Sequence, residues 1–243
     1  MEFKGPSVYD QDDFFACYMK RRGRKESPNN AIEGPIIFEL LGSYRGLSIL
    51  DLGCGDASFG KELLLQGAES YVGLEGSVQM RKEALKNLQG VNGNVIAGVM
   101  ESYEYPTDTY DLVTSRFAIH YVSDIEKLFQ QIYNTLKEGG RFVFSVQHPV
   151  TTSSFKSKQS GDKREDWVVD DYFRESERSE PWLSQSVVKY HRTIESYFRS
   201  LVNAGFQITD LREGAPVRAR FEEESEYQRR LKIPLVLAFS CIK

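Results

Sequence analysis

The stretch that decides the fold is Ile49–Asp56, which reads Ile-Leu-Asp-Leu-Gly-Cys-Gly-Asp. Its apolar start predicts a buried strand, and two glycines, Gly53 and Gly55, follow it. Because glycine has no Cβ, such a loop can turn tightly and approach a bound molecule closely. The helix predicted after the loop leaves its first backbone N–H groups free to face that molecule. The stretch therefore predicts a ligand-binding loop at the end of the first strand of an α/β sheet.

The sequence around this loop alternates between strand and helix patterns. Short apolar runs predict strands at residues 48–52, 71–74, 94–97, 110–115 and 141–146. Apolar residues at helical spacing predict helices at 59–66, 78–88 and 125–136, and we expect Gly139 and Gly140 to end the last of them. This order is typical of parallel strands joined by right-handed crossovers, which is a doubly wound α/β sheet.

Two segments depart from the alternation. Residues 1–46 contain two short helical patterns and predict an N-terminal helical cap. Residues 149–189 are polar but carry four aromatic side chains, which a solvated linker would not need, and predict a lid inserted into a main domain of residues 47–243. Beyond the lid we expect a helix at 193–204, a strand at 206–211, an exposed helix at 222–232 and a final strand at 235–242.

The composition argues against several classes of protein. A formal net charge of −4 disfavours non-specific nucleic-acid binding. Cys17, Cys54 and Cys241 are odd in number and widely spaced, which disfavours a disulfide framework and a cysteine zinc site. The start has no signal-peptide pattern, and no apolar run approaches the ~20 residues of a membrane helix. We expect a cytoplasmic protein that binds neither nucleic acid nor membrane.

An acidic residue after the second strand points to a nucleoside-containing cofactor. Glu75 follows Gly53 by 22 residues, close to the ~20 expected for an acid that accepts hydrogen bonds from ribose hydroxyls. NAD(P)-dependent oxidoreductases, the main alternative, share such an acid but bind pyrophosphate with GxGxxG, and here Gly60 comes too late for the third glycine. Asp51 would also repel a pyrophosphate, whereas it suits a ligand with ammonium and sulfonium groups.

Four stretches together resemble class I S-adenosylmethionine-dependent methyltransferases, in the small-molecule, methyltransferase type 11-like group typified by ubiquinone-type enzymes. In the expected order, they are Asp51–Gly55, Val72–Ser77, Tyr110–Ser115 and Leu136–Arg141. The resemblance implies a Rossmann-like fold with a mostly parallel seven-stranded sheet and an antiparallel last strand. It also implies S-adenosyl-L-methionine as cofactor and methyl transfer to a small-molecule acceptor by in-line displacement.

The resemblance further implies roles for individual residues. Asp51, Gly53 and Gly55 would surround the methionyl part of the cofactor, and Glu75 would hold its ribose. Other residues implied to bind the cofactor are Gly76, Ser77, Met80, Met100, Glu101, Ser115, Arg116 and Phe117. Met80 lies on the apolar face of its predicted helix, so a place in the core is an equal alternative. Within or just after the basic run 20–25, Arg22 and Asn30 are candidates for binding the cofactor carboxylate or an anionic substrate.

Three histidines are candidates for assisting the transfer as a general base. His120 and His148 follow the fourth and fifth strands, and His191 begins the element after the lid. Because the carboxyl ends of parallel strands share one edge, we expect all three near the acceptor. A structural hydrogen bond is an equal alternative for each. They lack the close spacing of zinc ligands, and we expect no metal.

The lid and its flanks resemble one bacterial subgroup of these enzymes, which supports an enclosed small-molecule acceptor. The matching residues are His148, Pro149, Trp167, Asp170, Asp171, Tyr172, Phe173, Trp182, Tyr190, His191, Arg192 and Thr193. Two further alternatives stay open, a non-catalytic module that binds S-adenosylmethionine and a tRNA methyltransferase.

Overall fold

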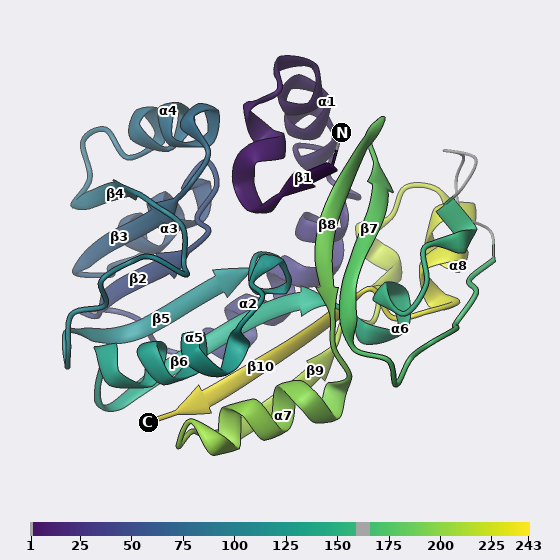
Figure 1. Cartoon of the computed structure of the whole chain (residues 1–243). Coiled ribbons are helices and arrows are strands. Elements are labelled where there is room, and N and C mark those ends of the chain that lie inside the picture. The colour runs from purple at the N-terminus through teal and green to yellow at the C-terminus, as the bar shows by residue number, and fades with distance from the viewer. Residues whose placement is uncertain (1, 159–165) are drawn as a thin grey trace.

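The computed structural model describes residues 2–158 and 166–243, and its centre is a seven-stranded sheet in the order β4-β3-β2-β5-β6-β10-β9 (Figure 1). The strands are β2 (Ser48–Leu52), β3 (Ser70–Glu75), β4 (Gly93–Ala97), β5 (Tyr110–Arg116), β6 (Leu136–Gln147), β9 (Gln207–Glu213) and β10 (Val236–Ile242). β10 pairs antiparallel with both β6 and β9, whereas the pairs among β2 to β6 are parallel. The predicted doubly wound fold with an antiparallel last strand is confirmed.

Helices cover both faces of this sheet, because successive strand residues point to opposite sides. Val113 and Phe142 belong to a core shared with α5 and α7, whereas their neighbours Leu112 and Val143 belong to a core shared with α2 and α3. The helices of the alternating part and its flanks are α2 (Gly34–Leu41), α3 (Ser58–Leu65), α4 (Val78–Asn87), α5 (Ile125–Thr135) and α7 (Ile194–Asn203). Both faces of the parallel strands are thus buried, so a ligand can reach the sheet only at the ends of the strands.

The turn between α5 and β6 differs from the prediction. The helix ends at Thr135, and Leu136 already begins β6, so Gly139 and Gly140 lie within the strand instead of ending the helix. Tyr110 pairs with Leu136 and Leu112 with Arg141, so the extra residues between them form an irregularity at the start of the strand. Gly139 has a φ of 71°, which suits glycine and explains its presence there.

A second, three-stranded sheet lies over the carboxyl ends of the main sheet and has the order β1-β8-β7 (Figure 1). β7 (Ser176–Trp182) and β8 (Gln185–His191) form an antiparallel hairpin inside the predicted lid, and β1 (Glu2–Lys4) pairs parallel with β8. We did not predict these strands. The hairpin turn is made by Leu183 and Ser184, both with positive φ, where the usual sequence signal is glycine or asparagine.

The N-terminal segment and the remaining short helices surround the same edge. The N-terminal elements are η1 (Gly5–Asp10), α1 (Asp12–Arg22) and the π-helical η2 (Asn29–Glu33). The others are η3 (Ile119–Tyr121), α6 (Pro149–Thr152), η4 (Lys156–Lys158), η5 (Arg218–Arg220) and α8 (Glu224–Leu231). Part of the predicted lid, residues 159–165, lies outside the described residues. Among the helices that are described, none has the length and apolar character needed to span a membrane.

Candidate functional site

A cavity of about 2070 Å³ lies at the carboxyl ends of β2, β3, β5 and β6. Its floor includes the predicted ligand loop, with Gly53 and Gly55, and the strand-end residue Glu75. Its walls come from the N-terminal segment, the β7–β8 hairpin and α8. One continuous space therefore joins the loop to the segments that we predicted as cap and lid.

The loop conformation requires glycine at two positions. Gly53 and Gly55 have φ values of 73° and 59°, which disfavour any residue with a Cβ. A Cβ on Gly53 would also lie 2.5 Å from the Cβ of Ala118 and 3.2 Å from Cε of Met100. The loop thus packs closely on the residues after β5 while its backbone faces the cavity.

Glu75 is fixed by backbone donors. The N–H of Gly55 donates to Oε2 at 2.9 Å, and the N–H of Ser77 donates to Oε1 at 2.8 Å. Burial raises the pKa of Glu75, and these two backbone bonds partly oppose the rise. Because a carboxylate oxygen has more than one lone pair, Glu75 can still accept bonds from a vicinal diol in the cavity.

Asp51 is a buried carboxylate whose partners among the described residues are neutral. The hydroxyl of Tyr71 donates to Oδ2 at 2.6 Å, and that of Thr114 donates to Oδ1 at 3.0 Å. Burial raises its pKa, and those two bonds oppose the rise. The charges of Arg116 and Arg22 also oppose the rise, but the hydrogen-bond partners of the carboxylate are neutral, so the site favours a cationic group on the ligand.

Apolar side chains form a slot next to Glu75. This part of the cavity is lined by Leu74, Met80, Val99 and Met100, together with Gly76 and Glu101. Met80 is only 3% exposed, so it belongs both to the protein interior and to the cavity wall. A slot of this kind suits a flat purine ring.

Three residues with implied cofactor roles lie off the cavity wall. Ser77 caps α4 through a bond from the N–H of Met80, and Ser115 donates to the carbonyl of Leu52. Asn30 donates its amide to two backbone carbonyls near the end of α1. In the described structure these three side chains hold the backbone around the cavity, and we assign them no ligand contact.

Arg22 reaches the loop from the N-terminal segment. Its Nη1 lies 3.1 Å from Oδ1 of Asp56 and 3.9 Å from the position that a Cβ on Gly55 would occupy. It therefore lies next to the end of the cavity formed by the glycine loop.

Arg116 is held by an acidic residue that sequence reasoning missed. Its guanidinium pairs with Glu33, whose side chain is fully buried, and the hydroxyl of Ser145 donates to the same carboxylate at 2.8 Å. The guanidinium also lies over the ring of Phe59, 4.5 Å from its centroid. Both Arg116 and Phe117 line the cavity, but the network mainly fixes the N-terminal segment to the ends of β5 and β6.

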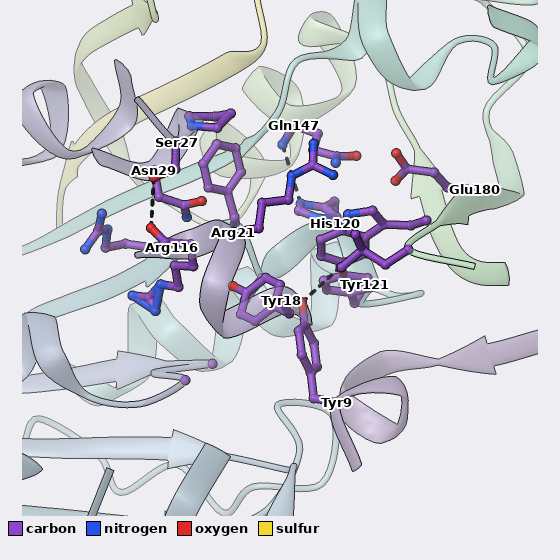
Figure 2. Close-up of a pocket in the computed structure, with 18 of the residues that line it drawn as sticks. Tyr9, Tyr18, Arg21, Ser27, Asn29, Arg116, His120, Tyr121, Gln147 and Glu180 are labelled. Atoms are coloured by element: carbon purple, nitrogen blue, oxygen red, sulfur yellow. Dashed lines mark hydrogen bonds between the residues drawn. The ribbon is translucent and has the colours of Figure 1, made fainter. Parts of the chain in front are cut away.

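Of the three histidines, His120 alone is among the residues that line the described cavity. Its Nδ1 accepts from the backbone N–H of Gln147 at 3.5 Å (Figure 2). Burial lowers its pKa well below the usual value, and the charges of Lys189 and Arg192 lower it further. His120 is therefore neutral near pH 7, and the bond at Nδ1 places its proton on Nε2.

His148 and His191 hold other parts of the chain in place. His148 accepts at Nδ1 from the N–H of Val150, capping α6, and its Nε2 lies 2.7 Å from Oε1 of Glu213. His191 is bonded to the hydroxyl of Thr152 at 2.7 Å and to the carbonyl of Tyr172 at 2.8 Å. His148 and His191 do not line the described cavity, because strand-end position does not fix side-chain direction, and their part in the transfer stays a prediction.

Four aromatic rings that line the cavity pack against one another, and we call them the aromatic roof. Neighbouring rings meet edge to face, with centroid distances of 4.9 to 6.2 Å. The aromatic roof consists of Tyr9, Phe14, Tyr18 and Trp182. Tyr121 adjoins it through its hydroxyl, 3.5 Å from that of Tyr9 (Figure 2). The rings come from η1, α1 and β7, and sequence periodicity could not predict that these three elements meet.

Two buried polar groups complete this side of the cavity. Lys189 forms a buried ion pair with Glu180, and its Nζ lies 4.7 Å from the Trp182 ring centroid. Gln147, at the end of β6, has a buried Oε1 for which the described residues offer no hydrogen-bond partner. Its position next to His120 makes it a candidate for binding a polar atom of a ligand (Figure 2).

Comparison with known proteins shows that the chain is similar to methyltransferases. A family model for a methyltransferase domain matches residues 50–144. An uncharacterised protein of Haemophilus influenzae is 33% identical over 219 residues, 85% of each chain. The ubiquinone/menaquinone biosynthesis C-methyltransferase of Hydrogenovibrio crunogenus is 31% identical over 69% of this chain and 68% of its own length. A demethylmenaquinone methyltransferase of Lactococcus lactis is 26% identical over 76% and 77% of the two chains.

The chain is also similar to solved structures of methyltransferases. An S-adenosylmethionine-dependent methyltransferase from Mesorhizobium loti superposes with a TM-score of 0.80 at 30% identity, covering 91% of this chain and 99% of that one. One from Listeria monocytogenes superposes with a TM-score of 0.79 at 29% identity, covering 87% and 96%. The coverage includes the segments outside the alternating part, so the similarity extends beyond the cofactor motifs.

Proposed function

Because the chain belongs to the class I S-adenosylmethionine-dependent methyltransferases, with S-adenosylmethionine as cofactor, we propose that it methylates a small molecule enclosed in the cavity. The observation that carries this proposal is that one cavity is lined by the glycine loop, by Glu75 and by the aromatic roof. Its volume exceeds the usual size of a single small-molecule site, which leaves room for an acceptor beside the cofactor. The NAD(P)-dependent alternative has no comparable support.

The residues present fit the cofactor. We assign the ribose hydroxyls to Glu75, the cationic methionyl end to Asp51, and the adenine to the slot around Met80 and Met100. Arg22, beside Gly55, is the candidate for the cofactor carboxylate. When bound, S-adenosylmethionine supplies a methyl group that its sulfonium activates toward nucleophiles.

The task left to the chain is to align the acceptor and to exclude water. The aromatic roof supports both, because packed rings present an apolar, rigid wall. We propose that residues 1–46 act as a cap and residues 149–189 as a lid. β1 pairs directly with β8, so the cap and the hairpin share one small sheet over the site.

We propose that His120 assists by binding the acceptor. With Nδ1 accepting from the Gln147 backbone, the neutral ring presents an Nε2–H donor, so His120 orients an acceptor oxygen or nitrogen instead of removing its proton. This role differs from the general base that we expected.

The test is transfer from methyl-labelled S-adenosylmethionine to separated small-molecule, RNA and protein fractions of a bacterial extract, followed by mass spectrometry. We expect label in the small-molecule fraction and release of S-adenosylhomocysteine. The His120→Gln variant should bind the cofactor like the wild type and transfer more slowly. Label confined to RNA would replace the proposal with the tRNA alternative, and cofactor binding without transfer to any fraction would indicate a non-catalytic module.

The names of two relatives suggest a quinone ring as one acceptor to include. The Lactococcus lactis relative is named for demethylmenaquinone, and the aromatic roof suits a planar ring. Incubation of demethylmenaquinone with the labelled cofactor is therefore a separate arm of the same experiment.

A further inference from the structure

Arginines from two distant segments line the part of the cavity beyond the cofactor loop. Arg21 lies in the last turn of α1 and Arg24 follows the helix, whereas Arg229 and Arg230 lie on α8. Glu226 pairs with both α8 arginines, at 2.7 Å from Nη2 of Arg230, and so shares one carboxylate between two guanidinium groups. Arg229 and Arg21 therefore place two further positive charges near Arg230, against the shared carboxylate of Glu226.

Arg230 is buried without full compensation. Its side chain is 10% exposed, and the described residues offer its Nε no hydrogen-bond partner. Burial lowers its pKa to about 10, with further lowering by Arg229 and Arg21 against a rise from Glu226. A desolvated guanidinium with an unused donor is unfavourable unless a ligand supplies an acceptor.

Arg21 faces the same cluster from α1. Burial lowers its pKa, and the charges of Arg24 and Arg229 lower it further. Figure 2 shows its side chain extending toward the strand-end residues Gln147 and His120. It thus bridges the space between the α8 arginines and the end of the cavity where we place the acceptor.

Arg21 and Arg22 are adjacent but serve different ends of the cavity. Neighbouring helical residues point about 100° apart. Arg22 turns to Asp56 and the glycine loop, which leaves Arg21 to the α8 side. The nearby carboxylate of Glu26 accepts from the backbone N–H groups of Glu222 and Glu223, so it is engaged elsewhere.

We propose that an anionic oxygen group of the acceptor, a carboxylate or a phosphate, binds between Arg21 and Arg230. Guanidinium groups match the paired oxygens of both anions and prefer them in sites with little water. The inference rests on the proposed function, since it assigns a chemical class to the acceptor in the same cavity. It also favours a charged acceptor over a neutral quinone.

The test is calorimetric binding of phenyl phosphate and of benzoate to the full chain saturated with S-adenosylhomocysteine, at low ionic strength. The variants are Arg230→Gln and Arg21→Gln. The matched control is Arg199→Gln, which removes one positive charge from an exposed pair with Glu195 on α7. Each cavity variant should weaken the preferred probe about tenfold or more, whereas the control should stay within about twofold.

The binding results distinguish the possible anions and can overturn the proposal. Binding of one probe and not the other identifies phosphate or carboxylate as the anion. The proposal is overturned if the wild type binds neither probe, or if both cavity variants behave like the control. It is also overturned if they weaken S-adenosylhomocysteine as much as the probe, because the cluster would then serve the cofactor carboxylate. Since Arg21 is only partly buried, its variant keeps the test valid if Arg230→Gln fails to fold. Absence of methyl transfer would leave these binding results intact.

Discussion

Removal of the Tyr71 hydroxyl tests how the Asp51 carboxylate is kept ionised and able to bind a cationic group. The hydroxyl donates to Asp51 at 2.6 Å inside the protein, and its own pKa is raised well above the usual value by burial, so it stays protonated. In Tyr71→Phe the ring remains, but Asp51 keeps Thr114 as its only hydroxyl donor among the described residues. Burial then acts on the carboxylate with less opposition, and the Asp51 pKa rises further.

The size of the effect follows from the bond that is lost. A hydrogen bond to a charged group contributes about 1.5–3 kcal/mol, and 1.36 kcal/mol corresponds to one pH unit, so the Asp51 pKa should rise by about one to two pH units. A cationic ligand prefers the ionised carboxylate. Cofactor affinity therefore increases as pH rises through the Asp51 pKa, and the variant should need a higher pH to reach the same affinity.

The assay is calorimetric titration with S-adenosylhomocysteine from pH 5 to pH 8. The variant profile should be displaced upward in pH and should approach the wild-type affinity at the alkaline end. Glu75 also has a raised pKa, but it is present in both proteins, so the difference reports on Asp51. Tyr44→Phe, which removes a surface bond to Gln66, is the control. Coincident profiles, or a loss that is the same at every pH, would refute the reasoning.

Three further substitutions test stability. Glu33→Gln leaves the Arg116 guanidinium buried without its carboxylate, and should lower the free energy of unfolding in urea by about 3–5 kcal/mol. Gly53→Ala should lower it by about 2–5 kcal/mol, because of the positive φ and the clash with Ala118, and should abolish cofactor binding in calorimetry. His120 has a lowered pKa in the folded protein, so below pH 6.5 the unfolded chain binds the proton that the folded chain excludes, and stability falls as pH falls. His120→Gln should reduce this slope by up to about 1.4 kcal/mol per pH unit in urea titrations at pH 5 to 6.5.

The first two substitutions have matched controls. Glu39→Gln breaks an exposed pair with Arg212 and should cost about 1 kcal/mol or less. Gly90→Ala has the same kind of positive φ as Gly53 but meets no atom within 4 Å, so it isolates the strain from the clash. A Glu33 variant as mild as its control, a Gly53 variant no worse than Gly90→Ala, or an unchanged pH slope without His120 would contradict the respective argument.

The sheet could be predicted because its signals are local. Apolar runs, helical spacing and the Gly53–Gly55 loop each lie within a few residues, and the handedness of crossovers limits how parallel strands can be connected. The β7–β8 hairpin could not be predicted, since Leu183 and Ser184 adopt positive φ without glycine or asparagine. The three residues of β1 become a strand only because β8 offers an edge.

Only those site residues could be predicted whose place in the fold is determined by the end of a strand. Asp51 and Glu75 follow directly from the strands and line the cavity. His148 shares that strand-end position, yet its ring turns to Val150 and Glu213, a direction that depends on tertiary packing. Glu33 reads as an ordinary residue before a helix, and only the folded chain shows it buried against Arg116.

The pairing of β1 with β8 has a consequence for how the enzyme is made. Glu2 pairs with Ser186, so the small sheet over the cavity combines two segments that lie far apart in the sequence. Contacts this far apart in sequence form slowly, because a long loop must close first. Until β1 arrives, β8 presents an open edge that includes the apolar residues Val187 and Val188, and such an edge is a template for association with another chain. The first strand of this protein thus both completes the covering of the site and shields a surface that would otherwise aggregate.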